Sequence, residues 1–146
     1  MISCAKEFRA LLQSRRTELV DLATLAVSRT PGLKAYTRVD MEQIISGLLA
    51  AIVEALEESS REQLTFFVET VIPGLIQNGE SLSTIVHGTL VFITCVTADV
   101  SLSLQPEHRD EVIPWLANFW GEYASALVAS GFRALQEGPP SGFQVP

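Results

Sequence analysis

Apolar residues recur along most of this chain at the three- and four-residue spacing of an amphipathic helix. The first such segment runs from Ala5 to about Ser28, with the charged side chains falling mostly between its apolar positions, which are Phe8, Leu11, Leu12, Leu19, Leu22, Leu25 and Ala26. Pro31 and Gly32 end it, because proline disfavours helical geometry in the preceding residue and glycine tolerates a turn. The pattern predicts one helix followed by a loop of roughly ten residues.

Two further helices are predicted between this loop and residue 79. Asp40 is the expected N-cap of the first, because its carboxylate can accept hydrogen bonds from the free backbone donors of the opening turn. Ser60 is the expected cap of the second, and Pro73 is expected to kink it. Asn78 and Gly79 suit the left-handed turn that ends a helix.

The next segment has no formal charge from Ser81 to Ala98, and Ser81 or Ser83 is the expected start of its helix. Its apolar residues nearly encircle the helix, which predicts a central helix buried on all sides. The stretch is diluted by serine, threonine and histidine, and no basic cluster follows it, so we do not expect it to span a membrane.

The last helical region is predicted to begin at Pro106 and to bend or restart at Pro114. An aromatic set made of Trp115, Phe119, Trp120 and Tyr123 is expected mainly in the core, with the interface as the alternative. The sequence therefore predicts an all-α domain of about five or six helices over residues 1–137, packed in a globin-like or bundle arrangement. Residues 138–146 are predicted to form a disordered tail or linker.

Composition narrows the choice of partners. Hydrophobic residues make up 47% of the 146 residues and charged residues 18%, which suggests that surplus apolar surface meets another protein, most simply as a twofold homodimer. The formal net charge of -7 disfavours nucleic acid. Cys4 and Cys95 are expected to be reduced thiols, and the charged start of the chain is unlike a secretory signal, so a cytoplasmic location is predicted.

His87 is the candidate cofactor residue, because an imidazole on an apolar helix is what axial ligation of haem iron requires. A neutral core or interface histidine, bonded to a carbonyl or hydroxyl, is the alternative interpretation. His108 fits a solvated helix start, and its distance from His87 is not that of a metal motif. A third possibility is an apolar small molecule bound within the helices.

No pattern of enzymatic catalysis occurs in the sequence. There is no Gly-x-Ser-x-Gly elbow, no cysteine in a polar context, and no glycine-rich loop between a strand and a helix. The carboxylates lack the Glu-x-x-His spacing of di-iron helices and are read as a solvated helix face; they are Glu54, Glu57, Glu58, Glu62 and Glu69. A protein that is not an enzyme and holds no metal is predicted.

The middle of the chain has a recognisable order of helices and turns. It reads VDMEQIISGLLAAIVEAL and then REQLTFFVETVIPGLIQNGESLSTIVHGTLVF, with Asn78 and Gly79 at the turn and Ser81 and Leu82 opening the next helix. This order resembles the N-terminal domains of bacterial RsbR-type stressosome and related co-antagonist proteins. The resemblance implies a globin-like sensory domain that usually lacks haem, forms dimers, and is coupled to a phosphorylation-regulated signalling partner.

Overall fold

The computed structural model describes residues 2–33 and 37–137, and these residues form helices, turns and loops without any strand. The helices are α1 (Ala5–Ser14), α2 (Arg16–Ser28), α3 (Arg38–Glu58), α4 (Glu62–Gln77), α5 (Leu82–Ser103) and α6 (Pro106–Glu137). The predicted all-α fold of five or six helices is confirmed for this part of the chain. The tail predicted for residues 138–146 lies outside the described residues.

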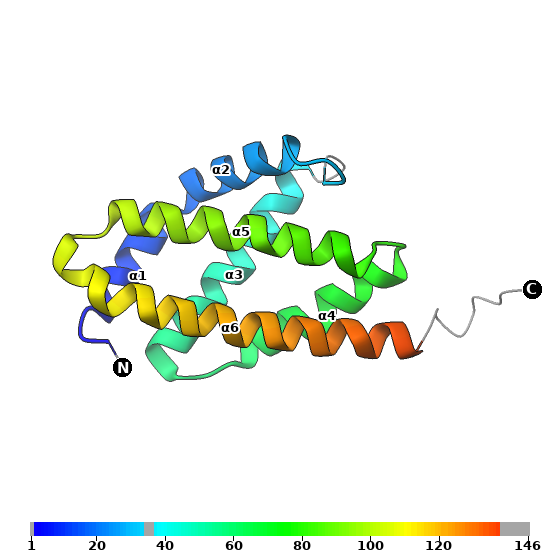
Figure 1. Cartoon of the computed structure of the whole chain (residues 1–146). Helices are drawn as coiled ribbons and strands as arrows, with labels where there is room; N and C mark the ends of the chain where they lie inside the picture. Colours follow the sequence, from blue (N-terminus) through cyan, green and yellow to red (C-terminus); the bar gives the residue numbers. More distant parts are fainter. Residues whose placement is uncertain (1, 34–36, 138–146) are drawn as a thin grey trace, which may run out of the picture.

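Helices α5 and α6 run side by side in opposite directions along one side of the molecule, and α3 crosses behind them (Figure 1). Helix α4 packs most extensively on α6, while α2 packs on α3 and α5. The largest side chains enclosed between the helices are all apolar; they include Phe8, Leu12, Leu19, Met41, Ile45, Leu48, Ile52, Leu56, Leu116, Phe119 and Leu127. This apolar core fixes which sides of the six helices remain outside.

The single helix predicted from Ala5 to Ser28 is wrong, because the chain bends at Arg15 into α1 and α2. Backbone bonding continues across the bend, since the Arg15 amide donates to Leu11 and its carbonyl accepts from Leu19. The Arg15 guanidinium donates two hydrogen bonds to the buried Asp99 carboxylate of α5, Nε to Oδ2 at 3.0 Å and Nη2 to Oδ1 at 2.6 Å. A buried carboxylate requires such a partner, and hydropathy spacing does not reveal it.

Helix α3 begins earlier than predicted. Thr37, not Asp40, is its N-cap, and the Thr37 hydroxyl accepts from the Asp40 amide at 3.2 Å. The Asp40 carboxylate in turn accepts from the Thr37 amide at 2.7 Å. This reciprocal pair is a capping box, in which the acidic residue stands three positions after the cap.

The C-terminal end of α4 agrees with the prediction, and its N-terminal end lies one residue later than predicted. Its N-cap position is Arg61 instead of the predicted Ser60, although the Ser60 hydroxyl accepts from the Glu62 amide at 3.3 Å. At the other end Gly79 has a φ of 95°, and the amides of Gly79 and Glu80 donate to Ile76 and Leu75. This is the Schellman arrangement that the Asn-Gly pair predicted, and α4 continues through Pro73 to reach it.

Helix α5 has the predicted start but not the predicted surroundings. Ser81 is its N-cap and accepts from the Thr84 amide at 3.1 Å. The prediction of a central helix buried on all sides is wrong, since only 33% of its most apolar 18-residue window is buried. The uncharged side of α5 that faces away from the core is therefore surface.

The start of the last helix and its buried aromatic residues agree with the prediction, but the helix does not restart at Pro114. It begins at Pro106, as expected, and runs as one helix through Pro114. Phe119, Trp120 and Tyr123 are buried, which confirms the core assignment of these aromatic residues. Half-buried Trp115 stacks on Phe119 with 5.8 Å between ring centroids.

We expect Thr37→Ala to lower the free energy of unfolding by about 1 kcal/mol, because it removes the hydroxyl that caps α3. Urea denaturation followed by circular dichroism measures this change. The control is Thr70→Ala at an exposed position within α4, where alanine suits the helix and no loss is expected. Equal stabilities of the two variants would contradict the role of the capping box.

We expect Asp99→Asn to cost more stability than Thr37→Ala. The amide keeps the shape of the carboxylate but leaves the Arg15 guanidinium without a counter-charge at the bend between α1 and α2. The same denaturation measurement ranks the two variants. A loss no larger than that of Thr37→Ala would show that the bend does not depend on the charge pair.

Candidate functional site

The main candidate site is an apolar face formed by the outward sides of α5 and α6. We call it the α5–α6 face and define it by six residues: Val86, Leu90, Ile93, Val128, Phe132 and Leu135. Three of these are more than half exposed, namely Leu90 at 56%, Phe132 at 55% and Leu135 at 52%. Their spacing of three, four and seven residues places them on one side of each helix.

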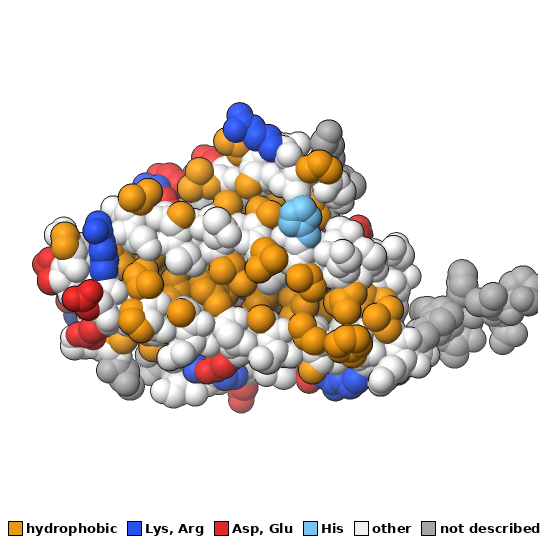
Figure 2. Space-filling view, in the orientation of Figure 1, with side chains coloured by type: hydrophobic (Ala, Val, Ile, Leu, Met, Phe, Trp, Pro, Cys, Tyr) orange, Lys and Arg blue, Asp and Glu red, His pale blue; other side chains and the backbone are white. Residues whose placement is uncertain are grey.

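This face is uncharged along its length. Asp99, the charged residue of α5, turns inward to Arg15, and α6 has no charged residue between Glu122 and Arg133. Figure 2 shows the result as a band of hydrophobic side chains along the furrow between α5 and α6, with charged side chains only at its margins. An apolar patch of this kind on a small protein is typical of an interaction site.

Two contacts set the close approach of α5 and α6 beneath the face. The Trp120 indole Nε1 donates to the Thr97 hydroxyl at 3.0 Å. Gly131 meets the Leu82 side chain so closely that a Cβ atom added to the glycine would lie 2.5 Å from a Leu82 methyl carbon. The two helices are thus joined by a hydrogen bond beyond one end of the face and come closest where Gly131 has no side chain.

His87 lies on the exposed side of α5 and not in the core, which corrects the expectation that it sits on a buried helix. The apolar cavity nearest to it is lined by its neighbours Thr84 and Gly88 but not by His87 itself. That cavity measures about 40 Å³, whereas pockets for drug-sized ligands measure ~300–1,000 Å³. A haem held by His87 would therefore bind on the outer surface of α5.

Tyr123 also lines this cavity and is the most strongly perturbed acid in the core. Burial raises the pKa of the Tyr123 phenol to about 12, and a hydrogen bond with Thr89 opposes the shift only in part. Burial likewise raises the pKa of the Cys95 thiol and, together with nearby Glu111, that of the Cys4 thiol. Both cysteines are free thiols, and raised pKa values leave them weakly nucleophilic.

The described residues contain no group of three or more His, Cys, Asp or Glu side chains arranged to hold a metal ion. Helix α5, with 22 residues and a mean hydropathy of 1.7 over its best window, is the one described helix long and apolar enough to cross a membrane. In the fold it packs on α1, α2, α4 and α6.

The sequence predicted that five glutamates form a solvated helix face. Glu54 departs from this prediction, because its carboxylate stabilises the turn between α3 and α4. Its carboxylate accepts from the Ser60 hydroxyl and from the Gln63 amide, the latter at 3.1 Å. Ser59, at the end of α3, has a left-handed φ of 53° that directs the chain back toward Glu54. Glu54 thus caps α4, a role that helical spacing alone does not predict.

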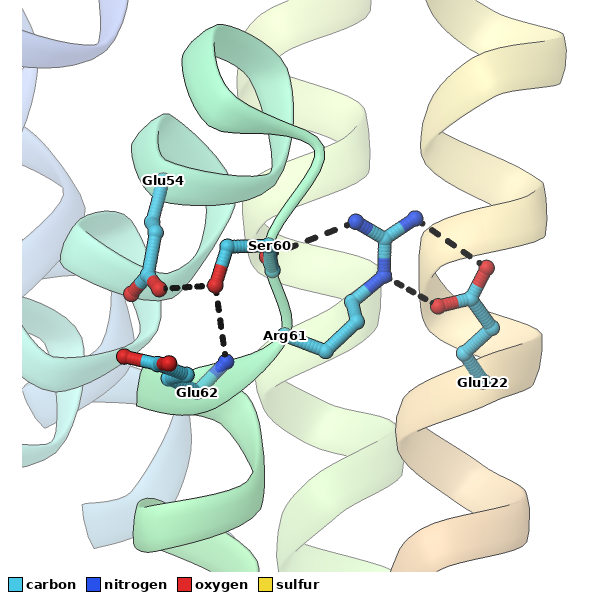
Figure 3. Close-up of polar contacts among 5 residues, drawn as sticks. All are labelled: Glu54, Ser60, Arg61, Glu62 and Glu122. Carbon is cyan, nitrogen blue, oxygen red and sulfur yellow. Dashed lines mark hydrogen bonds and ion pairs between the residues drawn. The ribbon is translucent and has the colours of Figure 1, made fainter.

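Next to this cap, Arg61 ties the turn to α6 (Figure 3). Its guanidinium donates through Nε and Nη2 to the two carboxylate oxygens of Glu122, the second at 3.2 Å, and through Nη1 to the Ser60 carbonyl at 3.4 Å. The hydrogen bonds from Arg61 lower the pKa of Glu122. Residues from three helices therefore meet at one corner of the molecule.

We expect Tyr123 to ionise near pH 12, well above its usual value of 10.0, in a titration that follows tyrosinate absorbance. Because the folded pKa is raised, this phenol stabilises the fold fully below about pH 10 and loses that contribution as the pH rises toward 12. Tyr123→Phe should remove the late step and leave that of Tyr36, the other tyrosine. A Tyr123 that titrates near pH 10 in the folded protein would contradict its burial.

Comparison of the chain with protein-family models, with curated proteins and with solved structures finds no match to any of them.

Proposed function

We propose that this chain is a non-enzymatic sensory or regulatory domain of bacterial signalling that acts through protein contacts, and that it forms a homodimer through the α5–α6 face. The observation that carries the proposal is the exposed, uncharged apolar surface along two neighbouring helices. Leaving such a surface in water is unfavourable, and covering it with protein recovers the hydrophobic free energy. The cytoplasmic location and the absence of a membrane span are part of the same proposal.

A second copy of the chain is the occupant that fits this face best. A partner for an uncharged surface must itself offer an uncharged surface, and the same face on another copy does so while the remaining surface carries the net charge of -7. Two antiparallel helices from each copy would form a four-helix arrangement around a twofold axis, the commonest symmetry of homo-oligomers.

Helices α5 and α6 are long enough to support a larger interface around the face. Helix α5 has 22 residues, which gives a length of about 33 Å at 1.5 Å per residue. The six residues of the α5–α6 face span about 11 Å along each helix, so they would form the centre of an interface, and the flanking parts of α5 and α6 would have to supply the rest of the ~800 Å² that each partner buries in a standard interface. Leu90, Val128 and Phe132 would then lie near its centre.

The resemblance of the central segment to RsbR-type domains supports the same interpretation, because it implies a globin-like domain that dimerises without haem and passes a signal to a partner protein. The dimer and the signalling role rest on independent grounds. The first is argued from the exposed face, and the second from the order of helices and turns between Asp40 and Val96.

Sedimentation equilibrium tests the dimer. We expect a wild-type mass close to twice 15.9 kDa at micromolar concentration. Phe132→Glu should weaken the dimer by about a hundredfold or more, because it places an unpaired charge in an apolar interface. The matched control is Phe66→Glu, which changes a phenylalanine on α4 that is at least as exposed and lies outside the face, and it should leave the mass unchanged.

Circular dichroism establishes that both variants are folded before their masses are compared. A wild-type protein that stays monomeric at hundreds of micromolar would overturn the proposed dimer. Equal dissociation of both variants would also overturn it, since the control lies outside the face. If the folded wild type instead co-sedimented with phospholipid vesicles and Phe132→Glu did not, the face would be assigned to a membrane surface.

A further inference from the structure

A second surface lies on helices that do not form the α5–α6 face. It is an open groove of about 940 Å³ bounded by α1, α3 and α4 and by Arg16 at the start of α2, and none of its lining residues belongs to α5 or α6. The floor is apolar and consists of Leu12, Leu49, Ala50 and Val53, and Phe66 adds a further apolar side chain to the lining. A groove that is open along its side does not enclose a small molecule as ligand pockets do, but it can accept a segment of polypeptide.

The rim of the groove is acidic. It carries Glu54, Glu57, Glu58 and Glu62, and the single basic lining residue is Arg16, whose guanidinium donates to the Ser46 hydroxyl at 2.6 Å. Glu57 pairs with Arg9 and Glu54 caps α4. Among the described residues neither Glu58 nor Glu62 forms an ion pair, so two carboxylates remain available on the rim.

Phe66 is the exposed apolar anchor of this surface. Its side chain is 67% exposed, which is the largest exposure among the aromatic residues that the structure describes. It lines both the main groove and a neighbouring hollow formed with Arg61, Thr65 and Glu69. A ring that stands between two hollows can be covered by a partner from both sides, which is how aromatic anchors contribute to binding.

The turn between α3 and α4, which adjoins the rim, is held in place by hydrogen bonds before any partner binds. Glu54, Ser60 and the Glu62 amide are joined by hydrogen bonds, and Arg61 links the same turn to Glu122 of α6, as Figure 3 shows. Ordering of loops and side chains is one of the costs of association, and a rim that is already ordered avoids part of it.

We propose that this groove binds a basic amphipathic helix of a partner protein, with apolar side chains against Phe66 and the floor and with lysine or arginine beside Glu58 and Glu62. The charge of the rim selects this occupant. Nucleic acid, an anionic membrane and a second copy of this acidic chain would each bring negative charge to a negative rim. The part of α3 that lines the groove, from Ser46 to Glu58, spans about 18 Å and matches a helix of three to four turns.

The inference rests on the proposed function in one respect, since it identifies the kind of partner with which a protein-interaction domain would work. It uses a different surface from the dimer, and the two can therefore be tested apart.

The test uses two fluorescently labelled synthetic helices of equal length with leucine on one face. One carries lysine on its flanks and the other carries glutamate. Fluorescence anisotropy with the full chain should show micromolar binding of the lysine peptide that weakens with salt, and binding at least about tenfold weaker for the glutamate peptide. Equal affinities for both peptides would overturn the proposal.

Variants locate the binding site. Phe66→Ala should weaken binding of the lysine peptide at least about tenfold, because it truncates the anchor. The double variant Glu58→Gln, Glu62→Gln should weaken it and reduce its dependence on salt. Phe132→Glu, on the other surface, should bind the peptide as the wild type does. Unchanged affinity in Phe66→Ala and in the double variant would overturn the proposal.

The two hypotheses then fail separately. A monomeric protein that binds the lysine peptide through Phe66 would refute the dimer and support the groove. A dimer that binds neither peptide would support the α5–α6 face and overturn the groove.

Discussion

Asp99 is the only Asp, Glu, Lys or Arg between Glu80 and Glu107, and its contact with Arg15 determines how α5 lies in the fold. A carboxylate is stable in the interior only beside a counter-charge, so the side of α5 that carries Asp99 must face the bend between α1 and α2. The opposite side of α5, with Leu90 at its centre, then faces outward. The outward side of α5 is therefore uncharged because Asp99, its one acidic residue, faces the interior.

Local features of the fold could be predicted from the sequence because short-range chemistry controls them. Gly79 takes the left-handed turn after α4, Ser81 caps α5, and Pro106 opens α6, each through a conformational preference or hydrogen bond that involves only a few neighbouring residues. The burial of Phe119 and Tyr123 followed from the size and spacing of aromatic residues. These signals need no knowledge of what lies across the core.

The features that the sequence did not predict depend on partners that are distant along the chain. Arg15 bends the first helix because of Asp99, which lies 84 residues later. Helix α5 was expected to be buried on all sides because its hydropathy has almost no direction around the helix, and an apolar pattern of this kind does not distinguish a central helix from one with an exposed apolar face. Glu54 could be identified as a cap only after Ser59 was placed in the left-handed conformation that reverses the chain.

Helix α6 carries Phe132 on the α5–α6 face, and although it does not line the groove, its Glu122 binds Arg61 in the turn beside the groove. Coupling between the surfaces would have to pass through the Arg61–Glu122 pair, whose side chains are 37% and 48% exposed. Exposed pairs of this kind contribute about 1 kcal/mol or less, and a long continuous helix offers no second arrangement for them to select. Binding at one surface should therefore have little effect on affinity at the other. A domain built in this way would transmit information by bringing partners together, because occupation of both surfaces raises the effective concentration of one partner near another without a change in shape.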